Sequence, residues 1–188
     1  LSLHSSADNH LLGELLGLYA GSTTWPLWSE SARWREQART MFIEQSLLQT
    51  SADGVNREQA AWYHRSVLEL MLVALRIADS EGFDAGEAFR ARCVAMLEYL
   101  ASIMDVGGHV PNFGDEDGAV LLRFDPAPDA HPWRSLLATG AALFNRADLK
   151  AVAGRFDDAS RWLLGEAGAE RFAALPAATK SGPVRRSF

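Results

Sequence analysis

The feature that most constrains the fold of this chain is the run VLELMLVALRI at residues 67–77, which is apolar on nearly every side of a helix. A helix on the surface of a globular protein buries one apolar stripe and keeps its other side polar, whereas a helix that is apolar all round must be enclosed by other elements. The run therefore predicts a central helix, and the rest of the chain has to supply the helices around it.

Turn and capping residues precede this run and set the predicted start of the central helix. Asp53-Gly54 is a turn dipeptide. Asn56 is a favourable N-cap, and Gln59 three residues later completes the spacing of a capping box. We therefore predict that the central helix spans residues 56–80.

Other segments have the apolar spacing of helices, and none has the alternation of a strand. The predicted ranges are 5–20, 29–49, 84–103, 131–145, 147–153 and 157–174. Ser5 or Ser6 is the expected cap of the first range, and Asp84 is the expected cap of the range 84–103. Residues 105–118 form a long, polar, Gly-rich loop, which between buried helices is more often functional than idle. The predicted class is all-α, built from antiparallel helical hairpins.

Composition and charge argue against several classes of protein. The net charge is −6 and the pI is near 5.3, whereas a nucleic-acid binder needs a basic face. No apolar run reaches the roughly 18 residues of a membrane span. The single cysteine, Cys93, excludes an internal disulfide and is expected to be buried in a helix. Because the chain begins at Leu1 without methionine and ends in a basic segment, we interpret it as an excerpt of a longer protein.

Chain topology predicts which polar residues gather together. Long helices joined by short turns run antiparallel to one another. The start of the first helix, the turn before the central helix, the start of the central helix and the long loop should then lie at one end. That end has two helix N-termini, whose N–H groups and dipoles favour a carboxylate or another anion. It collects residues 8–10, 57–59, 63–64 and 109–117.

Three side chains at this end are candidates for acid–base chemistry. Asn9 supplies an amide, His10 an imidazole and Tyr63 a phenol, and each alone would be interpreted as structural. Their predicted convergence, with Arg57 or Arg65 nearby, favours a functional site.

Neighbouring residues allow more than one interpretation. Trp62 is either a core residue or a sugar-stacking platform. The acidic residues 115–117 are a cation loop, a carboxylate pair for glycoside hydrolysis, or a tight turn in which Asp115 caps backbone groups. The five histidines lack the spacing of a zinc motif, so we predict neither a metal nor a cofactor.

Short motifs follow one another in a specific order over about residues 5–120. They are Asn9-His10 with Leu11-Leu12 and Glu14, then Arg33-Trp34, Asp53-Gly54, Glu58-Gln59 and Tyr63-His64, and finally Pro111, Gly114-Asp115 and Asp117. This series resembles the heparinase II/III-like family of polysaccharide lyases, which includes alginate and oligo-alginate lyases. The resemblance implies that residues 1–175 form part of an (α/α) toroid and that 176–188 lead toward an antiparallel β-sandwich domain that is absent here. It slightly favours a periplasmic or secreted location.

The resemblance also implies roles for individual residues in β-elimination at a uronic acid. Asn9 would neutralise the uronate carboxylate and so stabilise the enolate-like intermediate. Tyr63 would protonate the glycosidic oxygen, as general acid and in some members also as base, and His10 would be the base or support it. The implied supporting set, which orients Tyr63 or contacts the sugar, is Arg57, Glu58, Gln59, Trp62, His64, Arg65 and Asp115.

The expected partners are therefore an acidic polysaccharide or oligosaccharide and the β-sandwich domain of the same protein, with no nucleic acid and no membrane. We expect the excerpt alone to bind uronides weakly and to turn over little. Two alternatives remain open. One is a glycoside hydrolase on a similar α/α scaffold that uses Asp115 or Asp117 as its acid. The other is a helical glycan-binding or scaffold module without activity.

Overall fold

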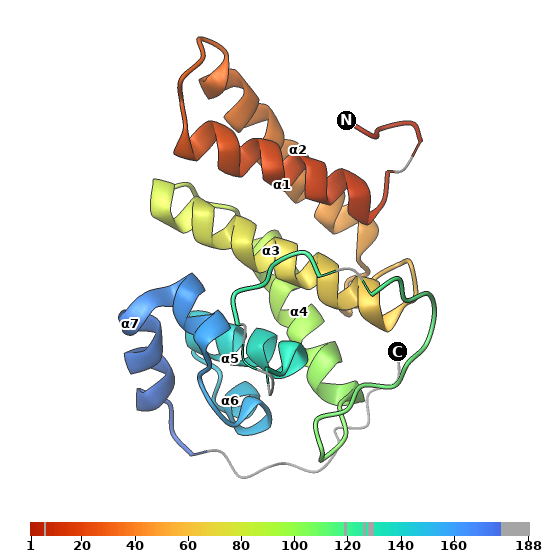
Figure 1. Cartoon of the computed structure of the whole chain (residues 1–188), viewed down its shortest axis with the longest axis vertical. Helices are drawn as coiled ribbons and strands as arrows, with labels where there is room; N and C mark the ends of the chain where they lie inside the picture. Colours follow the sequence, from red (N-terminus) through yellow and green to blue (C-terminus); the bar gives the residue numbers. More distant parts are fainter. Residues whose placement is uncertain (6, 119, 126, 128–129, 178–188) are drawn as a thin grey trace.

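The computed structural model describes residues 1–5, 7–118, 120–125, 127 and 130–177. Over these residues, the long elements of secondary structure are all helices (Figure 1). No strand occurs among them, and their one isolated β-bridge joins Thr50 to Asn56. The predicted all-α class is confirmed. The helices are α1 (Asn9–Thr24), α2 (Ser31–Gln49), α3 (Ala61–Glu81), α4 (Glu87–Ile103), α5 (Pro132–Phe144), α6 (Ala147–Ala153) and α7 (Asp158–Ala174).

Helix α3 lies between two groups of helices. The antiparallel hairpin of α1 and α2 packs on one side of α3, while α4 crosses behind it and α5, α6 and α7 cluster on the other side (Figure 1). Helix α3 contacts α1, α2, α4, α5 and α7. This enclosure explains why its apolar residues do not need to form a single stripe.

The core follows the apolar run of α3. Val67, Leu68, Met71 and Leu75 have no exposed surface and lie on one face of the helix, while Leu70 and Leu72, on either side of that face, are 4 % and 1 % exposed. Facing helices contribute Leu11, Leu12 and Leu15 from α1, Phe42 from α2, Phe89, Met96, Leu97 and Leu100 from α4, and Leu137, Ala138 and Ala141 from α5. The prediction of an enclosed central helix is confirmed.

Cys93 belongs to the same core. Its side chain is completely buried in α4, as the sequence predicts, and burial raises the pKa of the thiol to about 12. No helix in the described part of the chain combines the length and the apolar character needed to cross a membrane.

Two predicted helix starts are wrong by several residues. Helix α1 begins at Asn9, and its N-cap is Asp8, whose Oδ1 accepts a hydrogen bond from the backbone N–H of His10. Ser5 therefore does not cap it, and Ser6 lies outside the described residues. Helix α4 begins at Glu87 instead of Asp84, because Asp84 accepts from the N–H of Gly86 in a tight local turn.

The start of the central helix is also wrong in the sequence prediction. Helix α3 begins at Ala61, and Asn56 does not cap it. Asn56 is buried in the preceding turn, where its Oδ1 accepts from the N–H of Glu58 at 3.0 Å. Gln59 has a φ of +54°, which is left-handed and cannot continue a right-handed helix. The capping-box spacing is present, but the backbone uses it for a turn.

The turn of residues 50–60 is fixed against both α2 and α4. Arg57 N–H donates to the carbonyl of Gln49 at 2.9 Å, and Ser51 N–H donates to Val55 at 2.9 Å. Arg92 of α4 donates to the carbonyls of Leu47 and Thr50, which satisfies the C-terminal end of α2. The predicted turn at Asp53-Gly54 is confirmed.

The predicted division of the chain falls near the end of the described residues. The last turn of α7 leads to Leu175, which is buried. The predicted linker covers 176–188, of which 178–188 lie outside the described residues. The division into a helical domain and a linker therefore stays a prediction.

Gly54 allows the turn to approach α4 closely, and replacing it should destabilise the fold. Its φ is +91°, and a Cβ at this position would lie 2.3 Å from the backbone carbonyl carbon of Ala95. We expect Gly54→Ala to lower the free energy of unfolding by at least about 2 kcal/mol, because left-handed strain adds to a backbone clash. Urea denaturation followed by circular dichroism measures this change.

Gly17 provides the matched control for this substitution. It is exposed in α1, and a Cβ there meets no atom within 4 Å. Gly17→Ala should therefore stabilise the protein by about 0.5–1 kcal/mol, because alanine restricts the unfolded chain. Equal effects of the two substitutions would contradict the assigned role of Gly54.

Candidate functional site

Residues from three parts of the chain meet at the end where α1 and α3 begin. We call this set the polar rim and define it as Asp8, Asn9 and His10 of the α1 start, Glu58 of the turn, Tyr63 of α3, and Asp115 and Asp117 of the long loop. Two hydrogen bonds join the segments. Asn9 Nδ2 donates to Glu58 Oε2 at 2.7 Å, and the N–H of Ala61 donates to the carbonyl of Phe113 at 3.0 Å.

The long loop sits directly on the first residues of α3. Gly114 has a φ of +70°, and a Cβ on it would lie 2.6 Å from Cα of Ala60. Glycine is therefore required for this approach. The contact brings the carboxylates of Asp115 and Asp117 near enough to influence Tyr63.

A direct side-chain contact between Asn9 and Glu58 joins α1 to the turn before α3. Both residues are half-buried. Burial raises the pKa of Glu58, the nearby Asp8 carboxylate raises it further, and the hydrogen bond from Asn9 opposes the shift. Glu58 Oε1 is a buried atom without a hydrogen-bond partner among the described residues. The carboxyl group thus holds the Asn9 amide in one orientation.

Tyr63 lies in a negative electrostatic environment. The pKa of its phenol is raised, first by desolvation and then by the carboxylates of Asp117, Asp115, Glu58 and Asp8. A phenol at its ordinary pKa of about 10 is already protonated near neutral pH, and the raised pKa of Tyr63 leaves its hydroxyl in the protonated form that a proton donor requires.

His64 points away from the polar rim, into the contact between α3 and α4. Its Nε2 lies 3.2 Å from the carbonyl oxygen of Met96, and its ring centre lies 5.0 Å from that of Tyr99. Burial lowers its pKa to about 4. The structure thus gives His64 a packing role, and its role in orienting Tyr63 or in binding sugar stays a prediction.

Trp62 and Arg65 form a second group, directed toward α5. The guanidinium of Arg65 lies 4.1 Å from the ring centre of Trp62 and 5.9 Å from that of Trp133, and the two indole rings meet edge to face at 6.4 Å. The ring that was predicted to stack on sugar therefore already has a cation and a second indole against it. Sugar contacts by Trp62 and Arg65 stay predictions.

The remaining candidates lie on the surface of the turn and the loop. Arg57, Gln59 and Asp115 are all exposed, which leaves them accessible to a ligand, and their contacts with sugar also stay predictions. Among the described residues, no group of three His, Cys, Asp or Glu side chains is arranged to hold a metal ion.

The structure shows two relations that sequence reasoning missed. The first is the pairing of Glu58 with Asn9. The sequence predicted that both residues lie at the same end of the bundle, but it did not indicate a contact between them. The second is Glu69, which faces a cavity beside Arg65. The sequence signal for it was a single carboxylate inside the run of residues 67–77, which is apolar except at Glu69 and Arg76.

The fold and the polar rim define a helical protein in which helix N-termini, an amide and a protonated phenol gather at one end. A family model described as Heparinase II/III N-terminus matches residues 1–121. The chain belongs to this family, and the resemblance seen in its motifs is confirmed. The matched residues contain α1 to α4 and the whole polar rim, whereas α5 to α7 lie beyond them. No curated protein and no solved structure matches the chain.

The buried His64 should make stability depend on pH in a defined window. Its pKa is lower in the fold than the ordinary 6.5, so its contribution is complete above pH 6.5 and is lost as the pH falls toward 4. Between pH 7 and pH 5, we expect the native protein to lose about 2 kcal/mol more than His64→Phe. Urea denaturation at both pH values measures the difference, and His4→Gln, at an exposed position, should behave like the native protein.

The pairing of Asn9 with Glu58 predicts a specific titration. Because the pKa of Glu58 is raised, the side-chain amide signals of Asn9 in NMR spectra should shift with a midpoint above the ordinary glutamate value. Glu58→Gln should remove the transition, and Glu44→Gln, on the exposed side of α2, should leave it unchanged. A transition that persists in Glu58→Gln would assign the effect to Asp8 instead.

Proposed function

We propose that this chain is the helical part of a polysaccharide lyase that cleaves a uronic-acid-containing glycan by β-elimination. Membership of the heparinase II/III family implies a polysaccharide substrate. The observation that carries the proposal is the hydrogen bond that fixes the Asn9 amide to Glu58, at the same rim that holds the protonated phenol of Tyr63.

In the proposed reaction, each group has one task. The Asn9 amide donates to the uronate carboxylate and stabilises the negative charge that develops when the C5 proton leaves. His10 accepts that proton or supports the group that accepts it. The C4–O bond then breaks as the C4=C5 double bond forms, and Tyr63 donates its proton to the departing glycosidic oxygen. Glu58 positions Asn9 and does not take part in bond breaking.

The charge of the polar rim narrows the proposed substrate. Asp8, Glu58, Asp115 and Asp117 are all acidic, and Arg57 is an exposed cation of the same turn. A densely sulfated chain would meet repulsion here, whereas a glycan with one carboxylate per sugar would meet less. The charge therefore favours alginate or a lightly sulfated glycan over heparin.

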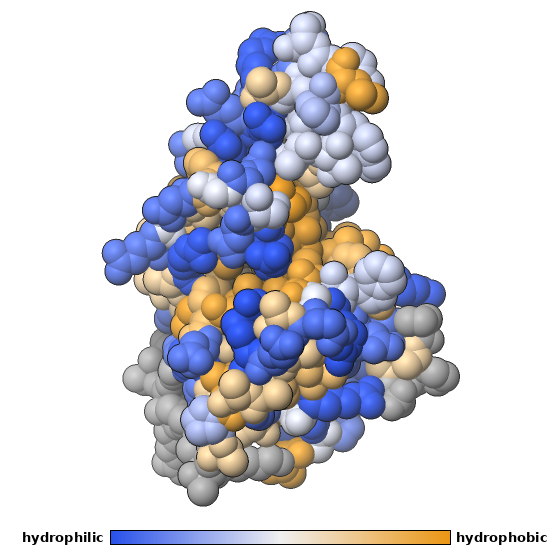
Figure 2. All heavy atoms as spheres, turned by 90° about the vertical axis from the view of Figure 1, so that its left-hand side faces the viewer, coloured by the Kyte–Doolittle hydropathy of each residue, from blue (hydrophilic) through white to orange (hydrophobic). Residues whose placement is uncertain are grey.

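Exposed apolar surface supports the proposal that the helices are part of a larger toroid. Figure 2 shows apolar atoms at the surface between the α1–α2 hairpin and the helices below it. The connection between α1 and α2 exposes Trp25, Leu27 and Trp28, and α7 exposes Trp162, which is 75 % accessible. Side chains of this size are normally covered, so we propose that further helices and the β-sandwich domain pack around this unit.

Substitutions in the polar rim test the proposed chemistry. In the protein expressed from its complete gene, Asn9→Ala and Tyr63→Phe should each lower the formation of unsaturated product, followed at 235 nm, by at least about 100-fold, because each removes a group that acts in the transition state. Glu44→Gln is the control for expression and folding. Undiminished activity of Tyr63→Phe would contradict the proposal.

The glycoside hydrolase alternative predicts a different order of activity losses among the variants. If Asp115 or Asp117 were the acid, alanine at either position would cost more activity than Tyr63→Phe, and the products would be saturated reducing sugars without absorbance at 235 nm.

For a binding or scaffold module, replacing Asn9, His10 and Tyr63 together would leave glycan binding intact. Isothermal titration with a uronate oligosaccharide measures that binding independently of turnover.

A further inference from the structure

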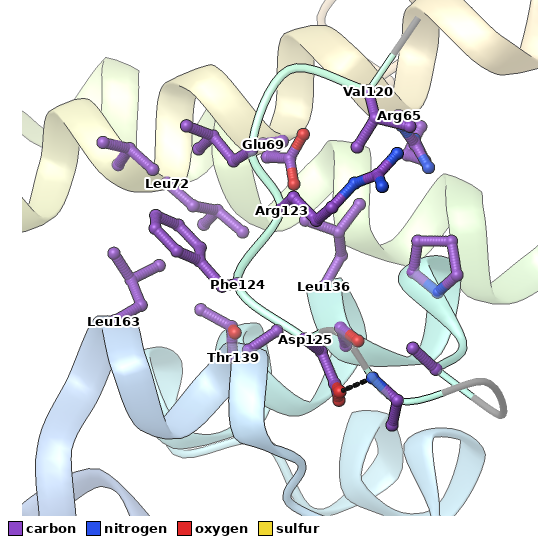
Figure 3. Close-up of a pocket in the computed structure, with 17 residues that line it drawn as sticks. Arg65, Glu69, Leu72, Val120, Arg123, Phe124, Asp125, Leu136, Thr139 and Leu163 are labelled. Atoms are coloured by element: carbon purple, nitrogen blue, oxygen red, sulfur yellow. Dashed lines mark hydrogen bonds between the residues drawn. The ribbon is translucent and has the colours of Figure 1, made fainter. Parts of the chain in front are cut away.

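A second site lies on the side of α3 that faces α5 and α7. It is a cavity of about 300 Å³ bounded by α3, by the segment of residues 120–125, by α5 and by α7 (Figure 3). Residues of α3 line it at positions 65, 69, 72 and 73, which is one face of the helix. Because α5 and α7 lie beyond residues 1–121, the cavity is built partly outside the region that the family model matches.

One side of the cavity is polar. Figure 3 shows the side chains of Arg65, Glu69 and Arg123 close to one another, with the Glu69 carboxyl group directed toward the segment that carries Arg123. Glu69 Oε2 is buried and has no hydrogen-bond partner among the described residues. Burial raises the pKa of Glu69 to about 7, and the charge of Arg65 opposes this shift. A buried acceptor without a partner is costly unless a ligand or a proton satisfies it.

The other side of the cavity is apolar. Leu72, Phe124 and Leu163 lie together in Figure 3, on the far side of the cavity from Arg65, and Leu136 borders the space between the two regions. These residues come from three different helices and from the covering segment. The volume lies near the lower end of the range for small-molecule sites, so the cavity suits a compact ligand with one polar end.

We propose that this cavity binds a small monocarboxylic acid with an apolar tail, its carboxyl group placed among Arg65, Glu69 and Arg123 and its tail against Leu72, Phe124, Leu136 and Leu163. The two guanidinium groups supply the positive charge that a carboxylate requires. A protonated Glu69 would donate a hydrogen bond to that carboxylate. The same two cations disfavour an amine, and the apolar wall disfavours a sugar, so this site is distinct from the polar rim in the ligand it selects.

Binding should depend on the protonation of Glu69. An ionised Glu69 would repel the ligand carboxylate, so binding is strong when the residue is protonated and weakens as the pH rises through about 7. The other charged groups that line the cavity are Arg65, Arg123 and Asp125, and Glu116 acts on Arg65 from the long loop. The carboxylate of Asp125 accepts from the N–H of Ala127 at 2.9 Å. Among these lining groups, burial brings the pKa of Glu69 into this range.

Octanoate is a suitable probe, and isothermal titration calorimetry can follow its binding to the 188-residue chain at pH 6 and pH 8. We expect saturable binding that is about tenfold weaker at pH 8, because the protonated fraction of a group with a pKa near 7 falls about tenfold over this interval. Glu69→Gln is the decisive variant. It keeps a hydrogen-bond donor and cannot ionise, so its affinity at pH 8 should match that of the native protein at pH 6.

Four controls make the outcome specific. Octylamine should not bind, and octanol should bind without dependence on pH. Thr139→Trp, which places a large side chain in the cavity, should abolish octanoate binding, while Glu44→Gln should not affect it. Circular dichroism checks that each variant is folded. If Thr139→Trp does not fold, loss of octanoate binding in Arg123→Gln, a change at an exposed side chain, serves instead.

The proposal is overturned if octanoate shows no saturable binding to the folded native chain, if octylamine binds more tightly than octanoate, or if Glu69→Gln retains the pH dependence. The measurement does not depend on lyase activity. Asn9→Ala should bind octanoate as the native protein does, so failure of the proposed function and failure of this proposal give different results.

Discussion

The burial of α3 on all sides is the constraint on which the rest of the structure depends. Its apolar residues point in every direction, so water must be excluded by α1 and α2 on one side, by α4 behind and by α5 and α7 on the other. This enclosure also determines where function can lie. The first turn of α3 and the face around Glu69 both present polar groups, and the two candidate sites lie there.

Two close backbone approaches position the polar rim. Gly54 lets the turn before α3 pack on the backbone of Ala95, and Gly114 lets the long loop pack on Ala60. Because each contact is made by backbone atoms, it leaves little freedom for the side chains that follow it. Glu58 is thereby held beside Asn9. A site assembled from separate helices requires this precision, since a displacement of about 1 Å can cost about 100-fold in rate.

The candidate sites differ in how a carboxyl group is used. In the polar rim, Glu58 orients an amide, and desolvation together with the surrounding carboxylates raises the pKa of the Tyr63 phenol. In the cavity, Glu69 stands beside Arg65 and titrates near neutral pH. The first arrangement suits proton transfer to an acidic glycan, and the second suits recognition of a carboxylate. Both depend on partial burial, which raises the pKa of each carboxyl group.

The sequence alone determined the helical class, the enclosed central helix, the turn at Asp53-Gly54 and the family, because these depend on local periodicity, turn chemistry and motif order. It also predicted which end of the bundle would be polar. Tertiary structure decided the rest. Asn56 has the spacing of a cap, yet packing of the turn against α4 buries it and delays the helix to Ala61. Packing of α3 against α4 also places His64 in the core. Two further features arise only where distant segments meet, namely the pairing of Glu58 with Asn9 and the cavity at Glu69. Local sequence fixes what a segment can form, whereas contacts between segments select the orientation and the protonation of each side chain.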